Sequence, residues 1–180
     1  MKNNFTKKYL SDINSTLNDL SQQDFNNFLK LIKNAKKTNN KIIFVGNGGS
    51  AAIASHVSVD FIKACKIRAI NFNEADLITC FSNDYGYENW VLEALKSYAE
   101  KKDVVVLISS SGQSKNILNA AKYCSKKKIK LITFTGFKKN NPIKKIGNLN
   151  FWVNSSKYNI IEMTHHIWIL MAVDYLTINK

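Results

Sequence analysis

The stretch that decides the fold of this chain is Lys41-Ile42-Ile43-Phe44-Val45-Gly46-Asn47-Gly48-Gly49-Ser50. Residues 41–45 contain a short continuous apolar run, which is typical of a strand that is buried on both faces. The glycines that follow allow the backbone to bend sharply and to expose its amides. Residues 51–64 then show a helical pattern. The order of strand, glycine turn and helix predicts one unit of a parallel α/β sheet.

Outside this stretch the same alternation continues to the end of the chain. Further strands are predicted at residues 68–72, 104–108, 129–135 and 150–153. Helices are predicted at residues 75–82 and 87–99, with a turn at residues 83–86 between them. Further helices are predicted at residues 115–127 and 159–178, with a short helix opened by Asn141-Pro142. Strands that alternate with helices form a parallel sheet covered on both faces. We therefore expect an α/β three-layer sandwich with a five-stranded, flavodoxin-like sheet.

The N-terminal region has a different pattern from the rest. Residues 8–37 carry an apolar stripe at helical spacing, and Ser21 is a plausible cap between two helices. With no repeat and no linker, the chain is expected to form a single domain over residues 1–180. In this interpretation residues 1–38 are a helical extension for oligomer packing, and residues 41–180 are the α/β core.

Composition excludes several classes of protein. Of the 180 residues, 45% are hydrophobic, which argues against disorder. No stretch reaches the roughly 18–20 uninterrupted apolar residues of a membrane span, and the N-terminus lacks a signal-peptide core. The three cysteines, Cys65, Cys80 and Cys124, show no metal-binding or disulfide spacing. These features predict a cytoplasmic protein with no membrane partner.

The formal net charge of +13 raises the question of nucleic-acid binding. Arg68 is the only arginine, although arginine is the residue that most often reads guanine and phosphate in pairs of hydrogen bonds. The lysines are scattered over expected helix ends and loops, where a solvated surface accounts for them. A nucleic-acid partner is therefore not expected.

A second polar loop, Ser109-Ser110-Ser111-Gly112-Gln113-Ser114, also lies between a strand and a helix. Either loop alone could be an ordinary capped turn. Together they lie at the carboxyl ends of two parallel strands, where ligands bind in open α/β sheets, and each precedes a helix N-terminus that attracts anions. Neither loop has the lysine of a Walker motif or the spacing of a dinucleotide fingerprint. The pair predicts a site for a compact phosphate group.

The chain resembles the SIS (sugar isomerase) domain in the order and spacing of four segments. These are Val45–Ser50, the helix with His56, Asn83–Gly86 and Ser109–Ser114. Within it the resemblance is to the phosphoheptose isomerase family, and it covers essentially the whole chain. It implies a homotetramer that interconverts sedoheptulose 7-phosphate and a heptose 7-phosphate through an enediol. It also implies substrate contacts, with phosphate bound by Ser50, Ser109, Ser111 and Ser114 and sugar near Asn47, Gly48, Asp84 and Ser110.

The catalytic residues of the family are altered in this chain. His56 and Asp60 stand where the family has a His and a Glu one helical turn apart. Glu162 stands at the position of a Gln on the last helix, and Leu170 at that of a His that acts as the acid. His165 and His166 follow Glu162 at a spacing that allows either to share its face of the helix.

These changes leave several alternatives open. The side chains of His56, Asp60, Glu162 and His166 are a credible ligand set for Zn²⁺ or another divalent metal. Without a metal, Asp60 or Glu162 would move the proton, and His165 or His166 would protonate the oxygen. The alternative function is a non-catalytic SIS domain that acts as a sugar-phosphate sensor or a protein-binding module, which the loss of the acid His at Leu170 favours.

Overall fold

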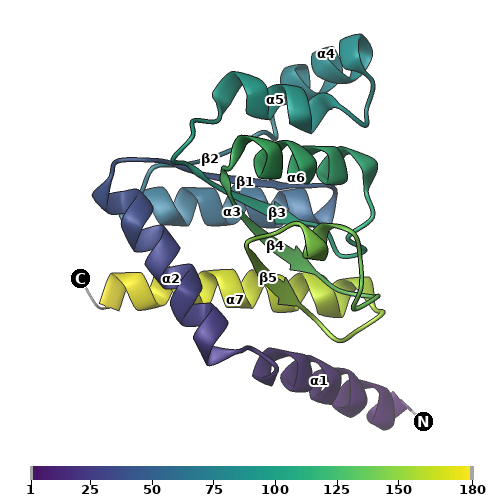
Figure 1. Cartoon of the computed structure of the whole chain (residues 1–180). Coiled ribbons are helices and arrows are strands. Elements are labelled where there is room, and N and C mark those ends of the chain that lie inside the picture. Colours follow the sequence, from purple (N-terminus) through teal and green to yellow (C-terminus); the bar gives the residue numbers. More distant parts are fainter. Residues whose placement is uncertain (1, 179–180) are drawn as a thin grey trace.

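The computed structural model describes residues 2–178, and a five-stranded parallel sheet runs through its centre (Figure 1). The strands are β1 (Ile42–Gly46), β2 (Ala69–Asn71), β3 (Val104–Ile108), β4 (Lys130–Thr135) and β5 (Leu149–Trp152). Their order is β2-β1-β3-β4-β5, so the flavodoxin-like prediction is confirmed. In the sheet Ile42 of β1 is level with Ala69 on one side and with Val104 on the other. The strand order therefore reverses between β1 and β3, the switch point at which such sheets bind ligands.

Helices cover both faces of the sheet. They are α1 (Lys2–Asn18), α2 (Gln22–Lys37), α3 (Gly49–Lys63), α4 (Ala75–Tyr85), α5 (Trp90–Tyr98), α6 (Lys115–Lys127), the short 3₁₀ helix η1 (Ile143–Lys145) and α7 (Tyr158–Ile178). Phe44 and Val106 face a core formed with α2, α3 and α7, whereas Val45 and Leu107 face one formed with α5 and α6. Burial on both faces is the reason that the strands read as continuous apolar runs.

The structure places α2 within the sandwich rather than in an extension for oligomer packing. Ser21 caps this helix by accepting a hydrogen bond from the Asp24 backbone N–H at 3.2 Å, which confirms the predicted break. Phe28 is fully buried, and its ring packs edge-on against Phe134 and Phe151 at centroid distances of 6.0 and 5.6 Å. Periodicity showed that α2 is amphipathic, but only the tertiary structure shows that its apolar face covers this chain's own sheet.

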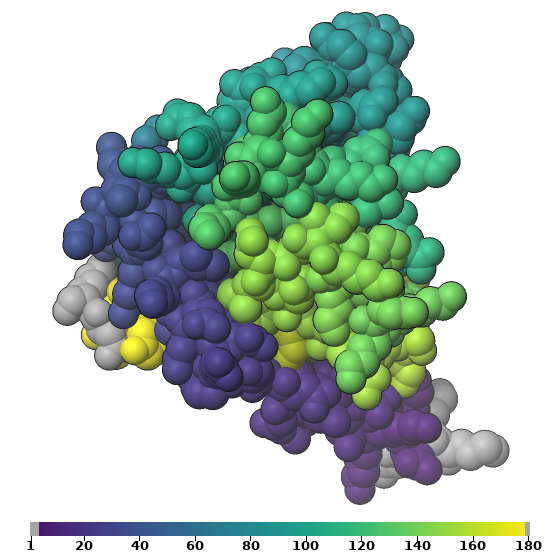
Figure 2. Space-filling view, in the orientation of Figure 1, coloured from purple at the N-terminus to yellow at the C-terminus, as the bar shows by residue number. Residues whose placement is uncertain are grey.

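Helix α1 extends from the body and rests on α7 (Figures 1 and 2). The Thr16 and Thr164 hydroxyls form a buried hydrogen bond of 2.8 Å between the two helices. The Lys157 ammonium donates to the Asp12 carboxylate at 2.6 Å nearby. The N-terminal helix is thus held by polar contacts at one end of α7.

Helix α4 corrects the predicted turn at residues 83–86. The helix continues through Asn83, Asp84 and Tyr85 and ends at Gly86, whose φ of +81° favours glycine. Helix α4 packs on α5 and buries none of its own residues. Within residues 2–178 no helix has the length and apolar character needed to cross a membrane.

Candidate functional site

A cavity of about 130 Å³ opens between the loops that follow β1 and β3. Its lining consists of Asn47, Ser50, Ile108, Ser109, Ser110, Ser111, Ser114, Tyr158 and Glu162. Water occupies about 30 Å³ per molecule in the liquid, so the volume is that of roughly four waters. The cavity therefore has room for a phosphate group, and the carbon chain of a sugar phosphate would extend out of it.

The first loop is shaped by glycine at the positions that need it. Gly48 has a φ of +55° and precedes the first residue of α3, and no side chain caps that helix. A Cβ on Gly46 would come within 2.6 Å of the Ser50 backbone, so the strand can turn into the helix only without a side chain there. The result is a buried Ser50 and a helix N-terminus directed at the cavity edge. Such an end attracts anions.

The second loop is anchored to the neighbouring strand. The Ser109 N–H donates to the Phe134 carbonyl at 3.0 Å, and the Ser110 carbonyl accepts from the Gly136 N–H at 2.8 Å. The Ser110 hydroxyl is buried and has no hydrogen-bond partner among residues 2–178. Ser114 is the residue before α6, and its side chain makes no capping bond. A buried hydroxyl without a partner is uncommon, and a phosphate oxygen in the cavity would satisfy it.

The two loops are joined by an amide pair that sequence reasoning missed. The Asn47 and Asn116 side chains exchange two hydrogen bonds, of 3.0 and 2.9 Å. Asn116 lies in the first turn of α6, is 2% exposed, and its Oδ1 also accepts from the Ile117 N–H. The only sequence signal for it is an amide residue two positions after Ser114, the last residue of the second loop. This pair fixes the distance between the loops that line the cavity.

Helix α7 supplies the two remaining cavity residues, Tyr158 and Glu162. Glu162 is partly buried, and burial raises the pKa of its carboxyl above the usual value. The carboxylate packs on Gly49, since a Cβ at position 49 would lie 2.8 Å from the Glu162 Cδ. Tyr158 also lines the cavity, and its side chain is 58% exposed.

A chain of polar contacts lies beside the cavity and not in it. The His56 Nδ1 and His166 Nε2 atoms are 2.8 Å apart, and the His56 Nε2 is 3.2 Å from the Asp60 carboxylate. Burial and the neighbouring His56 lower the pKa of His166, while Asp60 acts in the opposite direction. The structure thus brings together three of the predicted residues on α3 and α7, and none of the three lines the cavity.

His165 is the remaining histidine that was predicted as a site residue, and the structure places its side chain in the core. It is 0% exposed, and its ring packs edge-on against Phe134. Its Nε2 lies 3.0 Å from the Thr135 carbonyl, to which it donates as the neutral tautomer. Burial lowers the pKa of His165 to about 4, more than the hydrogen bond raises it. A neutral, enclosed imidazole is a packing residue and has no access to a substrate.

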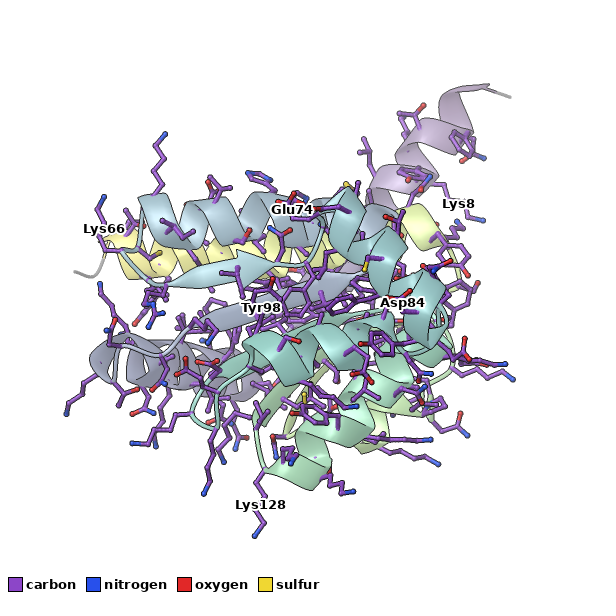
Figure 3. The ribbon with its side chains drawn as sticks, turned by 90° about the horizontal axis from the view of Figure 1, so that it is seen from above. Lys8, Lys66, Glu74, Asp84, Tyr98 and Lys128 are labelled. Carbon is purple, nitrogen blue, oxygen red and sulfur yellow. The ribbon has the colours of Figure 1, made fainter. Side chains whose placement is uncertain are left out.

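The metal prediction and the Asp84 prediction gain no support from the geometry. Over residues 2–178 no three or more His, Cys, Asp or Glu side chains are arranged to hold a metal ion. Asp84 lies on exposed α4, where it accepts a hydrogen bond from Asn83, and Figure 3 shows it near the end of that helix. Gly48 shapes the first loop but is not among the cavity-lining residues. The five predicted serines and Asn47 do line the cavity.

Comparison with known proteins supports the resemblance. The sequence model for the SIS domain matches residues 8–136, more than two thirds of the chain. The chain belongs to the SIS-domain family. The matched segment contains both cavity loops and ends before α7, so Glu162 and the two adjacent histidines lie beyond it.

Two curated relatives carry the name phosphoheptose isomerase. The protein from Thermodesulfovibrio yellowstonii is 34% identical over 81% of this chain and 79% of its own length. Phosphoheptose isomerase 2 from Campylobacter jejuni is 38% identical, and that match spans 61% of each chain, less than two thirds of the relative. A solved phosphoheptose isomerase from Francisella tularensis superimposes with a TM-score of 0.88 at 22% identity, over 99% of this chain and 96% of its own. That likeness confirms the SIS fold.

Proposed function

We propose that this SIS domain is a phosphosugar isomerase of the phosphoheptose type. It holds the phosphate of a sugar phosphate in the serine cavity and converts the sugar between aldose and ketose forms through an enediol. The observation that carries the proposal is the cavity itself, where five serines and one amide meet at the switch point of the sheet. Two curated relatives that share this family are named phosphoheptose isomerases.

The cavity chemistry suits a phosphate monoester. Compact hydroxyl donors can surround a small tetrahedral anion, and the N-termini of α3 and α6 add the positive ends of two helix dipoles. No lysine, arginine or histidine lines the cavity among the described residues, so neutral donors and dipoles do the binding.

The test is hydrogen exchange at carbon. The protein is incubated in D₂O with sedoheptulose 7-phosphate and with shorter ketose phosphates, with and without added Zn²⁺, and deuterium at C1 and C2 is followed by NMR. Exchange with a phosphorylated sugar, and none with the unphosphorylated one, supports the proposal. A Ser110→Ala variant is expected to bind phosphate more weakly by about 10- to 100-fold, since one hydrogen bond to a charged group contributes about 1.5–3 kcal/mol.

A second candidate function is a non-catalytic sugar-phosphate sensor. Leu170, which stands at the position of the family's acid histidine, packs against the hydrophobic core and has no proton to donate. Binding of ketose phosphates without any carbon exchange, in both the metal-free and the metal-loaded samples, would establish this function and exclude the isomerase.

We further propose that the protein is cytoplasmic and that it self-associates, with a tetramer as the expected form. Exposed apolar side chains on neighbouring helices support self-association: Val59 and Ile62 on α3, and Met163, Ile167 and Met171 on α7. Several large apolar side chains exposed on two helices that contact each other are typical of a surface that a partner covers. Light scattering of the purified protein measures the mass directly, and a monomer at micromolar concentration would contradict this part of the proposal.

A further inference from the structure

The proposed isomerase needs one base that reaches the substrate carbons, and the chain offers two acids for this role. Asp60 is on α3, where its carboxylate is 3.2 Å from the His56 imidazole, and it does not line the cavity. Glu162 is on α7 and is the only carboxylate in the cavity lining of the described chain. The two acids therefore differ in their access to a phosphate-anchored sugar.

The position of Glu162 is defined by its contact with the first loop. Its carboxylate lies against the Cα of Gly49, so close that a Cβ at that position would come within 3.0 Å of Oε1. Gly49 is the first residue of α3, whose following residue, Ser50, also lines the cavity. A carboxylate at this place borders the phosphate cavity, and the carbon chain of a bound sugar phosphate must leave past the residues of this lining. Tyr158, one helical turn earlier on α7, flanks it.

We infer that Glu162 is the base of the proposed isomerase, and that the proton-transfer role lies on α7 rather than on α3. This assignment rests on the proposed function. In the aldose-to-ketose direction the Glu162 carboxylate takes the proton from C2. The electrons of the C2–H bond form the C1=C2 double bond, and the carbonyl electrons pass to O1, which takes a proton from solvent water. The enediol then loses its O2 proton to solvent water as C2=O forms, and C1 receives the proton from Glu162.

The surroundings of Glu162 suit this role. Burial disfavours the ionised form, so the carboxylate is a stronger base than one in water. Asp60, by contrast, is a third exposed and is paired with an imidazole. The same geometry explains why Gly49 carries no side chain, since a methyl group there would displace the carboxylate.

Three variants test the assignment. Glu162→Gln keeps the shape of the side chain but cannot accept the proton. Gly49→Ala leaves Glu162 in place but forces its carboxylate away, and the Gly49 backbone is not in the left-handed region, so alanine is compatible with the helix start. Glu74→Gln is the matched control, because Glu74 is exposed before α4 (Figure 3) and is not among the cavity-lining residues.

Two measurements are made on each variant: carbon exchange in D₂O, and affinity for inorganic phosphate by calorimetry. Glu162→Gln is expected to lose about 10²–10⁴-fold in exchange rate, the usual contribution of a general base. It should bind phosphate at least as tightly as the parent protein, because a negative charge at the cavity is removed. Gly49→Ala should also lose exchange while its thermal midpoint is maintained, and Glu74→Gln should change neither measurement.

The outcomes are distinct. Exchange that survives Glu162→Gln and disappears in Asp60→Asn overturns the assignment and moves the base to α3. Loss of phosphate binding together with exchange in Glu162→Gln also overturns it, since the side chain would then act in binding. Absence of exchange in the parent protein, with phosphate binding intact, overturns the proposed isomerase function and the assignment with it.

Discussion

Acidification should destabilise this protein through the buried imidazole of His165. Burial holds the pKa of this group at about 4 in the folded state, against 6.5 for an ordinary histidine. The unfolded chain therefore binds a proton between these pH values and the folded chain does not, so stability is complete above about pH 6.5 and is lost as the pH falls towards 4. A shift of one pKa unit corresponds to about 1.4 kcal/mol, which gives a loss of about 2 kcal/mol between pH 7 and about pH 4.5.

The assay is urea denaturation at these two pH values for the parent protein and for His165→Gln. Glutamine stays neutral and retains an N–H group for the Thr135 carbonyl, whose bond to His165 is 3.0 Å long. The other titratable groups change the free energy of unfolding equally in both proteins. The difference between the two proteins in how much stability they lose between the two pH values is therefore the contribution of His165. Histidine NMR should also show this imidazole neutral down to about pH 4. Equal losses in both proteins, or a His165 resonance that titrates near 6.5, would refute the reasoning.

Two further predictions concern buried polar groups. Asn116→Ala should lower the free energy of unfolding by about 1–3 kcal/mol, because it leaves Asn47 without its amide partner. The same variant should weaken phosphate binding. Unchanged phosphate affinity in calorimetry would show that the pair does not position the loops. Asp103→Asn should lower the free energy of unfolding by about 3–5 kcal/mol in urea denaturation, because fully buried Asp103 pairs with the Lys41 ammonium at 2.6 Å. A decrease below about 1 kcal/mol would mean that water solvates the Lys41 ammonium in the variant.

The sequence predicted the sheet well because its strands have few alternatives. A run such as Val104–Ile108 is too short for a helix and too apolar for an exposed edge, so a buried parallel strand remains. The break at Ser21 was also predictable, because the cap depends on a hydrogen bond three residues away. The turn predicted at residues 83–86 was wrong: Asn and Asp favour turns but are tolerated in an exposed last helical turn, and only Gly86 ends the helix.

The candidate site was predictable where its residues are close in sequence. Both serine loops follow strands, and parallel strands bring their carboxyl ends to one edge, so a shared cavity could be expected before any coordinates. The positions of the histidine side chains could not be predicted in this way. His165 and His166 are neighbours on α7, yet one is enclosed against Phe134 and the other contacts His56. Successive helical residues are about 100° apart, and sequence does not give the rotation of a helix that is apolar nearly all round.

By itself, then, the amino-acid sequence determined the parallel α/β sandwich and the position of the two loops that line the cavity, because these depend on local patterns and on the geometry of parallel strands. The tertiary structure alone decided which acid borders the cavity. Asp60 and Glu162 come from helices about a hundred residues apart, and their side chains are oriented by how α3 and α7 pack on one sheet face. That packing directs Glu162 onto Gly49 and leaves Asp60 beside His56.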